Sequence, residues 1–180
     1  MPNLDAYIPE GALTAEAEQK LLATCTDLLL KHEGADPTNE KFRSIAWVFV
    51  HRHESYVAGL PAEAPRYKFV CQVPEGQYDE ERRAAVTKEM TEALVEAEGG
   101  RWPNPEERVW VWTFEVPDGT WGGRGRVVSL PDIAAFGLGD AGRRYGEERL
   151  AERRREQARA LLEAAGAQDG AASYAAASPS

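Results

Sequence analysis

Short stretches rich in β-branched and aromatic residues alternate with two long segments in which apolar residues recur every three or four positions. The long segments, residues 15–32 and 80–98, have the spacing of amphipathic helices. Thr14 and Asp79 stand directly before them and suit the N-cap position, because their side-chain oxygens can accept a hydrogen bond from a first-turn amide. The short stretches are too short for helices and predict strands, the second of them buried. These strands cover residues 3–8, 43–50, 67–73 and 108–116.

The order strand, helix, strand occurs twice because the chain contains an internal repeat. The tetrapeptide IPEG at 8–11 recurs as VPEG at 73–76, and this offset of 65 residues then holds without a gap. Matched positions include Arg43 and Arg108, Trp47 and Trp112, and the dipeptide EG at 33–34 and 98–99. Chance does not supply a tetrapeptide and a spaced Arg and Trp set in one register, so the chain carries a tandem β-α-β unit.

Beyond the second repeat the composition of the chain changes. Residues 117–130 are rich in glycine and predict a hairpin. Residues 141–165 are rich in arginine and glutamate and predict a largely solvated helix. Residues 166–180 are small and of low complexity, which predicts a disordered tail. The predicted main domain covers 2–140, with pseudo-repeats 2–66 and 67–131.

Charge and composition exclude several classes of partner. The net charge of −9 argues against nucleic acid or an anionic membrane, because both favour a basic surface. The longest apolar run is too short to span a bilayer and the start has no signal-peptide pattern, so we expect a soluble cytoplasmic protein.

Cys25 and Cys71 fall inside predicted elements and should be buried and unpaired. His51 and His53 share a strand face, but no third ligand stands at metal spacing, so no metal site is predicted.

A proline directly after the initiator methionine, followed by strand, turn and helix, resembles the start of tautomerase superfamily chains. The two-unit length is similar to the fused branch that includes cis-3-chloroacrylic acid dehalogenase and malonate semialdehyde decarboxylase. The resemblance covers roughly residues 2–140 and implies an α/β fold with a four-stranded sheet backed by two helices. It also implies a homotrimer and a cofactor-independent tautomerase (an isomerase) or related lyase, whose N-terminal proline transfers protons.

Removal of Met1 would turn Pro2 into a secondary amine. The reference pKa of an α-amino group is about 7.7 to 8.0, and burial or a nearby arginine lowers it further, which leaves a neutral general base. A proline that stays protonated would instead act as a general acid. The resemblance implies a small enolisable oxo acid or unsaturated carboxylic acid as substrate. Arginines would then hold the carboxylate and stabilise the developing enolate.

The resemblance also assigns roles to individual residues. The stretch PTNEKFRS at 37–44 is similar to the decarboxylase segment with its acidic catalytic residue, which gives that role to Glu40. The hairpin DGTWGGRGR resembles that of the same enzyme and places Trp121 near the pocket mouth. His32 matches the dehalogenase helix end HRG through HEG, with a three-residue insertion, and Trp112 falls on the dehalogenase tyrosine. The candidate substrate-binding residues are Arg43, Arg108, Arg124, Arg126, Trp112, Trp121 and His32.

One departure from the family pattern leaves other functions open. Dehalogenase-like members carry a pair of arginines just after the third strand, where this chain reads VPEGQYD. A trimeric scaffold or binding module that keeps the fold without the chemistry is therefore an alternative. A further alternative is that the charged C-terminal helix recruits a partner.

Overall fold

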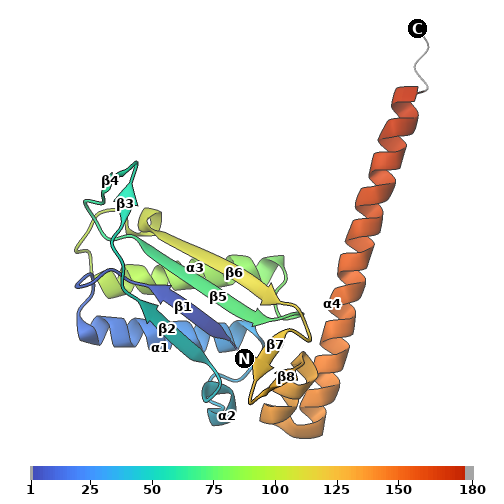
Figure 1. Ribbon diagram of the computed structural model, residues 1–180, viewed down its shortest axis with the longest axis horizontal. Coiled ribbons are helices and arrows are strands. Elements are labelled where there is room, and N and C mark those ends of the chain that lie inside the picture. The colour runs from blue at the N-terminus through green and yellow to red at the C-terminus, as the bar shows by residue number, and fades with distance from the viewer. Residues whose placement is uncertain (1, 177–180) are drawn as a thin grey trace.

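The computed structural model describes the backbone of residues 2–176 and the side chains of residues 2–166 (Figure 1). Its elements are β1 (Asn3–Tyr7), α1 (Ala15–His32), α2 (Glu40–Arg43), β2 (Trp47–His51), β3 (Tyr56–Val57), β4 (Leu60–Pro61), β5 (Tyr67–Pro74), α3 (Glu80–Glu98), the 3₁₀ turn η1 (Pro105–Arg108), β6 (Val109–Val116), β7 (Trp121–Gly123), β8 (Arg126–Val128) and α4 (Leu130–Ala176). The predicted order of strand, helix and strand is thus confirmed in both repeats.

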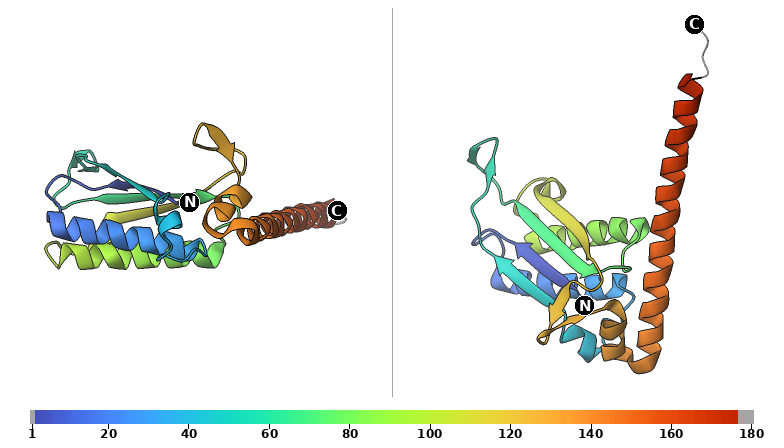
Figure 2. Two further views of the ribbon diagram at one scale, coloured as in Figure 1. Left: turned by 90° about the horizontal axis from the view of Figure 1, so that it is seen from below. Right: turned by 45° about the vertical axis from the view of Figure 1, so that its right-hand side comes forward.

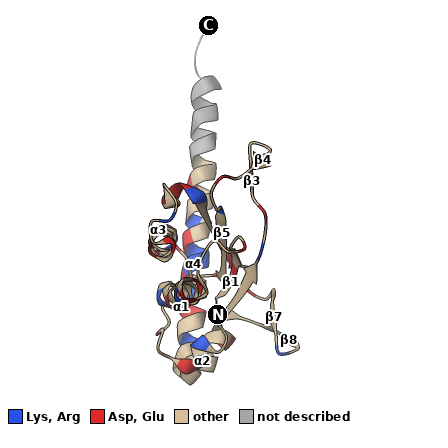
Figure 3. Ribbon diagram, turned by 90° about the vertical axis from the view of Figure 1, so that its left-hand side faces the viewer, with Lys and Arg blue, Asp and Glu red and all other residues tan. Residues whose placement is uncertain are grey.

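The main sheet has four strands in the order β2-β1-β5-β6. β1 is parallel to β2, β5 is parallel to β6, and the two central strands β1 and β5 are antiparallel. Each parallel pair with its crossover helix is one repeat. Helices α1 and α3 cover one face of the sheet, and the β3–β4 and β7–β8 hairpins project on the other side (Figures 2 and 3). The predicted α/β fold with two backing helices is confirmed.

The two repeats bury equivalent side chains in one core. Leu4 and Phe69 are fully buried at matching positions of β1 and β5, and Cys25 and Met90 are fully buried at matching positions of α1 and α3.

Helices α1 and α3 begin directly after Thr14 and Asp79, the two residues predicted to cap them. Thr14 Oγ1 accepts from the Ala17 amide at 3.2 Å, and Asp79 Oδ1 accepts from the Arg82 amide at 2.8 Å.

Both cysteines are free and buried, as expected. Burial raises the pKa of the Cys25 thiol to about 12, so the thiol stays protonated and packs as a small apolar group.

The strand predicted at 43–50 differs from the observed β2 in its start and its burial. Residues Glu40–Arg43 form the short helix α2, because Asn39 caps it by accepting from the Lys41 amide at 3.0 Å. The strand therefore begins only at Trp47. It lies at the sheet edge, and its Trp47 and Phe49 side chains are 62% and 48% exposed on the face without helices. An apolar strand is buried only where another layer covers it, and none of the described helices or sheets forms a layer over this face (Figure 2).

The C-terminal helix is longer than the predicted span of 141–165. α4 begins at Leu130, and Gly139 with φ 64° separates two helical segments that lie against each other. Their contact requires glycine, since a Cβ at Gly142 would fall 2.2 Å from the Ala134 carbonyl oxygen.

The tail predicted to be disordered from 166 is helical to Ala176, in keeping with the high helix propensity of alanine. Residues 177–180 lie outside the described residues.

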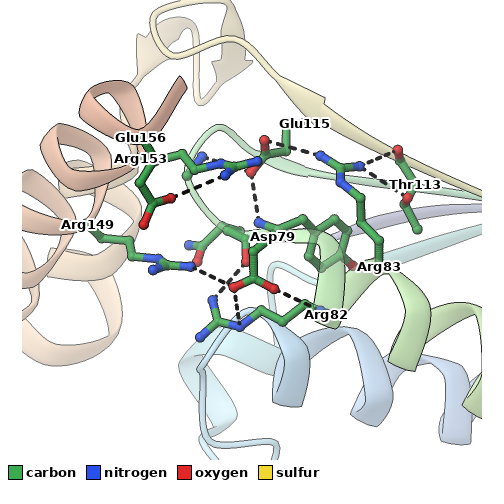
Figure 4. A network of polar contacts seen from close by, with 11 residues as sticks. Asp79, Arg82, Arg83, Thr113, Glu115, Arg149, Arg153 and Glu156 are labelled. Carbon is green, nitrogen blue, oxygen red and sulfur yellow. Dashed lines mark hydrogen bonds and ion pairs between the residues drawn. The ribbon is translucent and has the colours of Figure 1, made fainter. Parts of the chain in front are cut away.

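The first half of α4 is docked on the domain along one face, while most residues of 141–165 are exposed, as predicted for a largely solvated helix. Leu150 is 7% exposed, and its Cα lies 3.5 Å from the position a Cβ would take at Gly76. Arg154 Nε donates to Glu75 Oε1 at 2.8 Å, and Arg149 reaches from α4 toward Asp79 at 3.6 Å (Figure 4). The turn between β5 and α3 is therefore covered by α4. None of the helices in the described part of the chain has the length and apolar character needed to cross a membrane.

Candidate active site

Pro2 lies at the start of β1, at the end of the sheet where β2 also begins and β5 and β6 stop. We call this the Pro2 end. The Pro2 side chain is buried, and its carbonyl oxygen accepts from the Trp47 amide at 3.2 Å. The row Asn3, Gln72 and Phe114 crosses the sheet next to it. Pro2 is therefore held in the centre of the sheet and covered by its own chain.

A buried carboxyl group at the end of α1 also belongs to this region. Glu33 is 3% exposed, and burial raises the pKa of its carboxyl. The repeat matches Glu33 and Pro2 to Glu98 and Tyr67, and there the Tyr67 hydroxyl donates to Glu98 Oε1 at 2.7 Å. The pseudo-symmetry thus predicts that Glu33 lies beside Pro2. The repeated dipeptide EG contained this signal, although Glu33 was not among the residues predicted for the site.

A small cavity of about 90 Å³ lies between the β7–β8 hairpin and the start of α4, and Pro2 is not among its lining residues. Ile45, Arg124 and Arg126 are among its lining residues. Arg124 has φ 55° and places its guanidinium 4.6 Å from the centre of the Phe136 ring. Neither arginine forms an ion pair with a described carboxylate, and the one carboxylate that lines the cavity, Asp132, pairs with Arg143. Trp121, on β7, is half-buried in the same hairpin.

Arg43 and Glu40 lie on α2 rather than on a strand. The Arg43 guanidinium is bonded to Asp27 and donates to the Pro37 carbonyl at 2.9 Å. Its charge is therefore already compensated. Glu40 stands in the first turn of α2 and is exposed.

Arg108 lies at the opposite end of the sheet from Pro2, where β5 and β6 begin. We call this the Tyr67 end. Arg108 is 4% exposed, and its guanidinium pairs with Glu98 through two nitrogens. It also donates to the Pro103 and Pro65 carbonyl oxygens at 2.9 Å each. With its donors taken up in this way, Arg108 has the geometry of a structural residue.

Trp112 and His32 occupy two different layers of the fold. Trp112 is 44% exposed on the sheet face that carries no helices. His32 lies between the helices, with its Nε2 3.2 Å from Glu89 Oε1. We call this helix-free side of the main sheet the open face. On it, His51 Nε2 lies 2.6 Å from Asp5 Oδ1. In the described part of the chain no group of three His, Cys, Asp or Glu residues is arranged to hold a metal ion.

The turn VPEGQYD is fixed by a carboxylate instead of carrying an arginine pair. Glu115 Oε1 accepts from the amides of Gly76 and Tyr78 at 3.0 and 2.8 Å. Its second oxygen lies 3.3 Å from Arg83 Nη2, and Arg83 also donates to the Thr113 carbonyl (Figure 4). The sequence did not reveal this network, because its members come from β6, α3 and the turn between β5 and α3.

The chain has the fold of the tautomerase superfamily. Among solved structures it is similar to Pt0534 inactivated by 2-oxo-3-pentynoate, with 25% identity, 69% of this chain and 94% of that chain covered, and a TM-score of 0.57. It also resembles a symmetric trimer of fused 4-OT (19% identity, 72% and 97% covered, TM-score 0.57). A third similar structure is N1 of the cis-3-chloroacrylic acid dehalogenase family (15% identity, 70% and 82% covered, TM-score 0.56). No protein-family model matches the sequence, and no curated protein matches it.

Proposed function

We propose that the protein is a cofactor-independent isomerase or lyase that uses Pro2 as general acid or base on a small oxo acid or unsaturated carboxylic acid. The observation that carries this proposal is the position of Pro2 directly before the central strand β1, at the sheet end where β6 leads into the β7–β8 hairpin with Arg124 and Arg126. The similar Pt0534 is inactivated by 2-oxo-3-pentynoate, which is a 2-oxo acid. This supports the same ligand class here.

The proposed reaction begins once Met1 is removed and the Pro2 nitrogen is an amine. The amine takes a proton from the carbon next to the substrate carbonyl, and the electron pair of that C–H bond moves to the carbonyl oxygen. Arg124 or Arg126 stabilises the resulting enolate and holds the carboxylate. Return of the proton to another carbon completes a tautomerisation. Burial favours the neutral amine, whereas an ionised Glu33 beside it would favour the ammonium.

The open face of the sheet supports a trimer. It carries aromatic side chains on both outer strands, and Trp47 and Trp110 are 62% and 66% exposed. Trp112 and Phe114 continue the row on β6 at 44% and 49% exposure. Contiguous aromatic surfaces of this kind mark interaction sites, and the fused 4-OT structures similar to this chain are trimers. We infer that three protomers associate through this face.

Light scattering at micromolar concentration should give a molar mass in solution that is three times the 19.8 kDa mass of one protomer. Phe114→Glu should lower that mass, because it places a charge on the open face. Leu161→Glu, at a 72% exposed position of α4, is the matched control and should leave the mass unchanged. A wild-type protein that stays monomeric would contradict the trimer.

The burial of Pro2 and the pairing of Arg43 with Asp27 favour a second candidate, a trimeric scaffold that keeps the fold without the chemistry. Ketonisation of phenylenolpyruvate separates the two. An enzyme accelerates the loss of the enol in proportion to protein concentration, whereas a scaffold leaves the spontaneous rate unchanged.

A further inference from the structure

A pocket of about 580 Å³ lies at the Tyr67 end of the sheet, opposite to Pro2. The end of β1, the starts of β5 and β6, and the segment leading into β3 form its walls. Tyr7, Tyr56 and Trp110 supply aromatic surface, while Arg66 and Lys68 supply positive charge. The pocket is several times larger than the cavity beside Arg124, which measures about 90 Å³.

The repeat makes this pocket the counterpart of the Pro2 end. At the offset of 65 residues Tyr67 corresponds to Pro2, and Lys68 corresponds to Asn3. Because β1 and β5 are antiparallel, their starts lie at opposite ends of the strands of one sheet. The second end has no chain-terminal amine, so its use cannot be the proton transfer proposed for Pro2. What it has instead is a larger pocket with an arginine and a lysine.

Arg66 and Lys68 have no carboxylate partner among the described residues. The Lys68 ammonium lies 3.8 Å from the centre of the Tyr7 ring and 5.1 Å from that of Trp112. By contrast, the charge of Arg108 in the same pocket wall is compensated by Glu98. The lining includes one carboxylate, Glu107, which is exposed and accepts from Asn104 at 3.4 Å. The pocket therefore has a positive surplus in a chain whose net charge is −9.

Three lining residues hold polar atoms that are shielded from solvent and have no hydrogen-bond partner among the described residues. They are His53 Nδ1, Ser55 Oγ and Arg66 Nη1. Shielded polar atoms normally have a partner, since leaving one unpaired costs free energy. The serine and arginine groups can donate, and the histidine nitrogen donates in one tautomer. The missing partner is therefore a hydrogen-bond acceptor.

We propose that this pocket binds a small organic anion in which a carboxylate is joined to a flat apolar body. Arg66 and Lys68 hold the carboxylate, and the rings of Tyr7, Tyr56 and Trp110 enclose the flat body. A guanidinium binds a carboxylate through two parallel hydrogen bonds, and aromatic walls favour a planar ligand. The proposal does not depend on proton transfer by Pro2.

Calorimetric titration of the full-length protein with benzoate tests the proposal. Benzoate should bind once per protomer, and Arg66→Ala should weaken binding by roughly tenfold or more, because a charge-assisted contact is lost. Benzamide, which has the same ring without the charge, should bind more weakly by a similar factor. Arg155→Ala is the matched control. It removes the same charge from an exposed position on α4 and should leave benzoate binding unchanged.

Two further variants make the outcome specific to this pocket. Pro2→Ala should bind benzoate as the wild type does, and Arg66→Lys should retain more binding than Arg66→Ala. Tyr7, Lys68 and Trp110 lie on the sheet face through which the trimer is inferred to form, so light scattering is recorded for each variant to exclude a loss of assembly. If Arg66→Ala does not fold, Lys68→Gln replaces it. The proposal is overturned if benzoate does not bind, if folded Arg66→Ala and Lys68→Gln both bind it unchanged, or if only Pro2→Ala loses it.

Discussion

Replacing Pro2 with alanine is expected to lower the turnover of phenylenolpyruvate by roughly 10² or more, the usual effect of losing a positioned acid or base. Alanine keeps an amine at the chain start but makes it primary and removes the ring that fixes its direction. The substitution is small, and the Pro2 carbonyl that bonds to Trp47 belongs to the backbone. Circular dichroism should therefore show an unchanged fold.

Arginine variants serve as internal controls for that result. Arg124→Ala and Arg126→Ala remove unpaired guanidinium groups from the cavity beside the β7–β8 hairpin, so at least one should raise KM and lower kcat/KM. Arg43→Ala should leave both constants near their wild-type values, because Asp27 already compensates that charge. Full activity in Pro2→Ala, together with unaffected Arg124 and Arg126 variants, would mean that only the fold is shared with the superfamily.

Replacing Arg108 with alanine is expected to lower the free energy of unfolding by about 3–5 kcal/mol, the range for breaking a buried ion pair. The variant leaves the Glu98 carboxylate, whose side chain is fully buried, without its guanidinium partner. It also frees the carbonyl oxygens of Pro65 and Pro103 from their donor. Urea denaturation followed by tryptophan fluorescence would measure the change.

The repeat supplies the matched control for Arg108. Arg43 holds the equivalent position, and its side chain and that of Asp27 are 41% and 50% exposed. Exposed pairs contribute about 0–1 kcal/mol, so Arg43→Ala should shift the unfolding midpoint only slightly. Equal losses in the two variants would contradict the structural role given to Arg108.

Local signals in the sequence were enough to predict the elements of the core. Thr14 and Asp79 cap their helices as expected, because an N-cap acts on the amides of its own first turn. The start of β2 and its exposure were not predictable in the same way. Asn39 starts a helix that the apolar pattern concealed, and an apolar strand face carries no mark that distinguishes the core from a face between protomers.

The candidate site was less predictable, because it depends on which charges meet in space. The repeat identified Arg43 and Arg108 as equivalent, but it did not show that Asp27 and Glu98 compensate them. The docking of α4 through Arg149 was equally hidden, since its partner Asp79 lies 70 positions earlier in the chain. The glycine-rich hairpin at Arg124 and Arg126 was predictable from the sequence, and both arginines line the cavity beside it; their role in substrate binding stays a prediction.

Catalysis by the Pro2 amine is tested most directly by treating the protein with 2-oxo-3-pentynoate and mapping the product by intact-mass and peptide mass spectrometry. A free Pro2 amine adds across the activated triple bond and expels no leaving group. We expect a protein without Met1 that gains the mass of one inhibitor molecule, located on Pro2, with loss of ketonisation activity. Retention of Met1 in most molecules, or an adduct elsewhere with Pro2 unmodified, would contradict catalysis by the Pro2 amine.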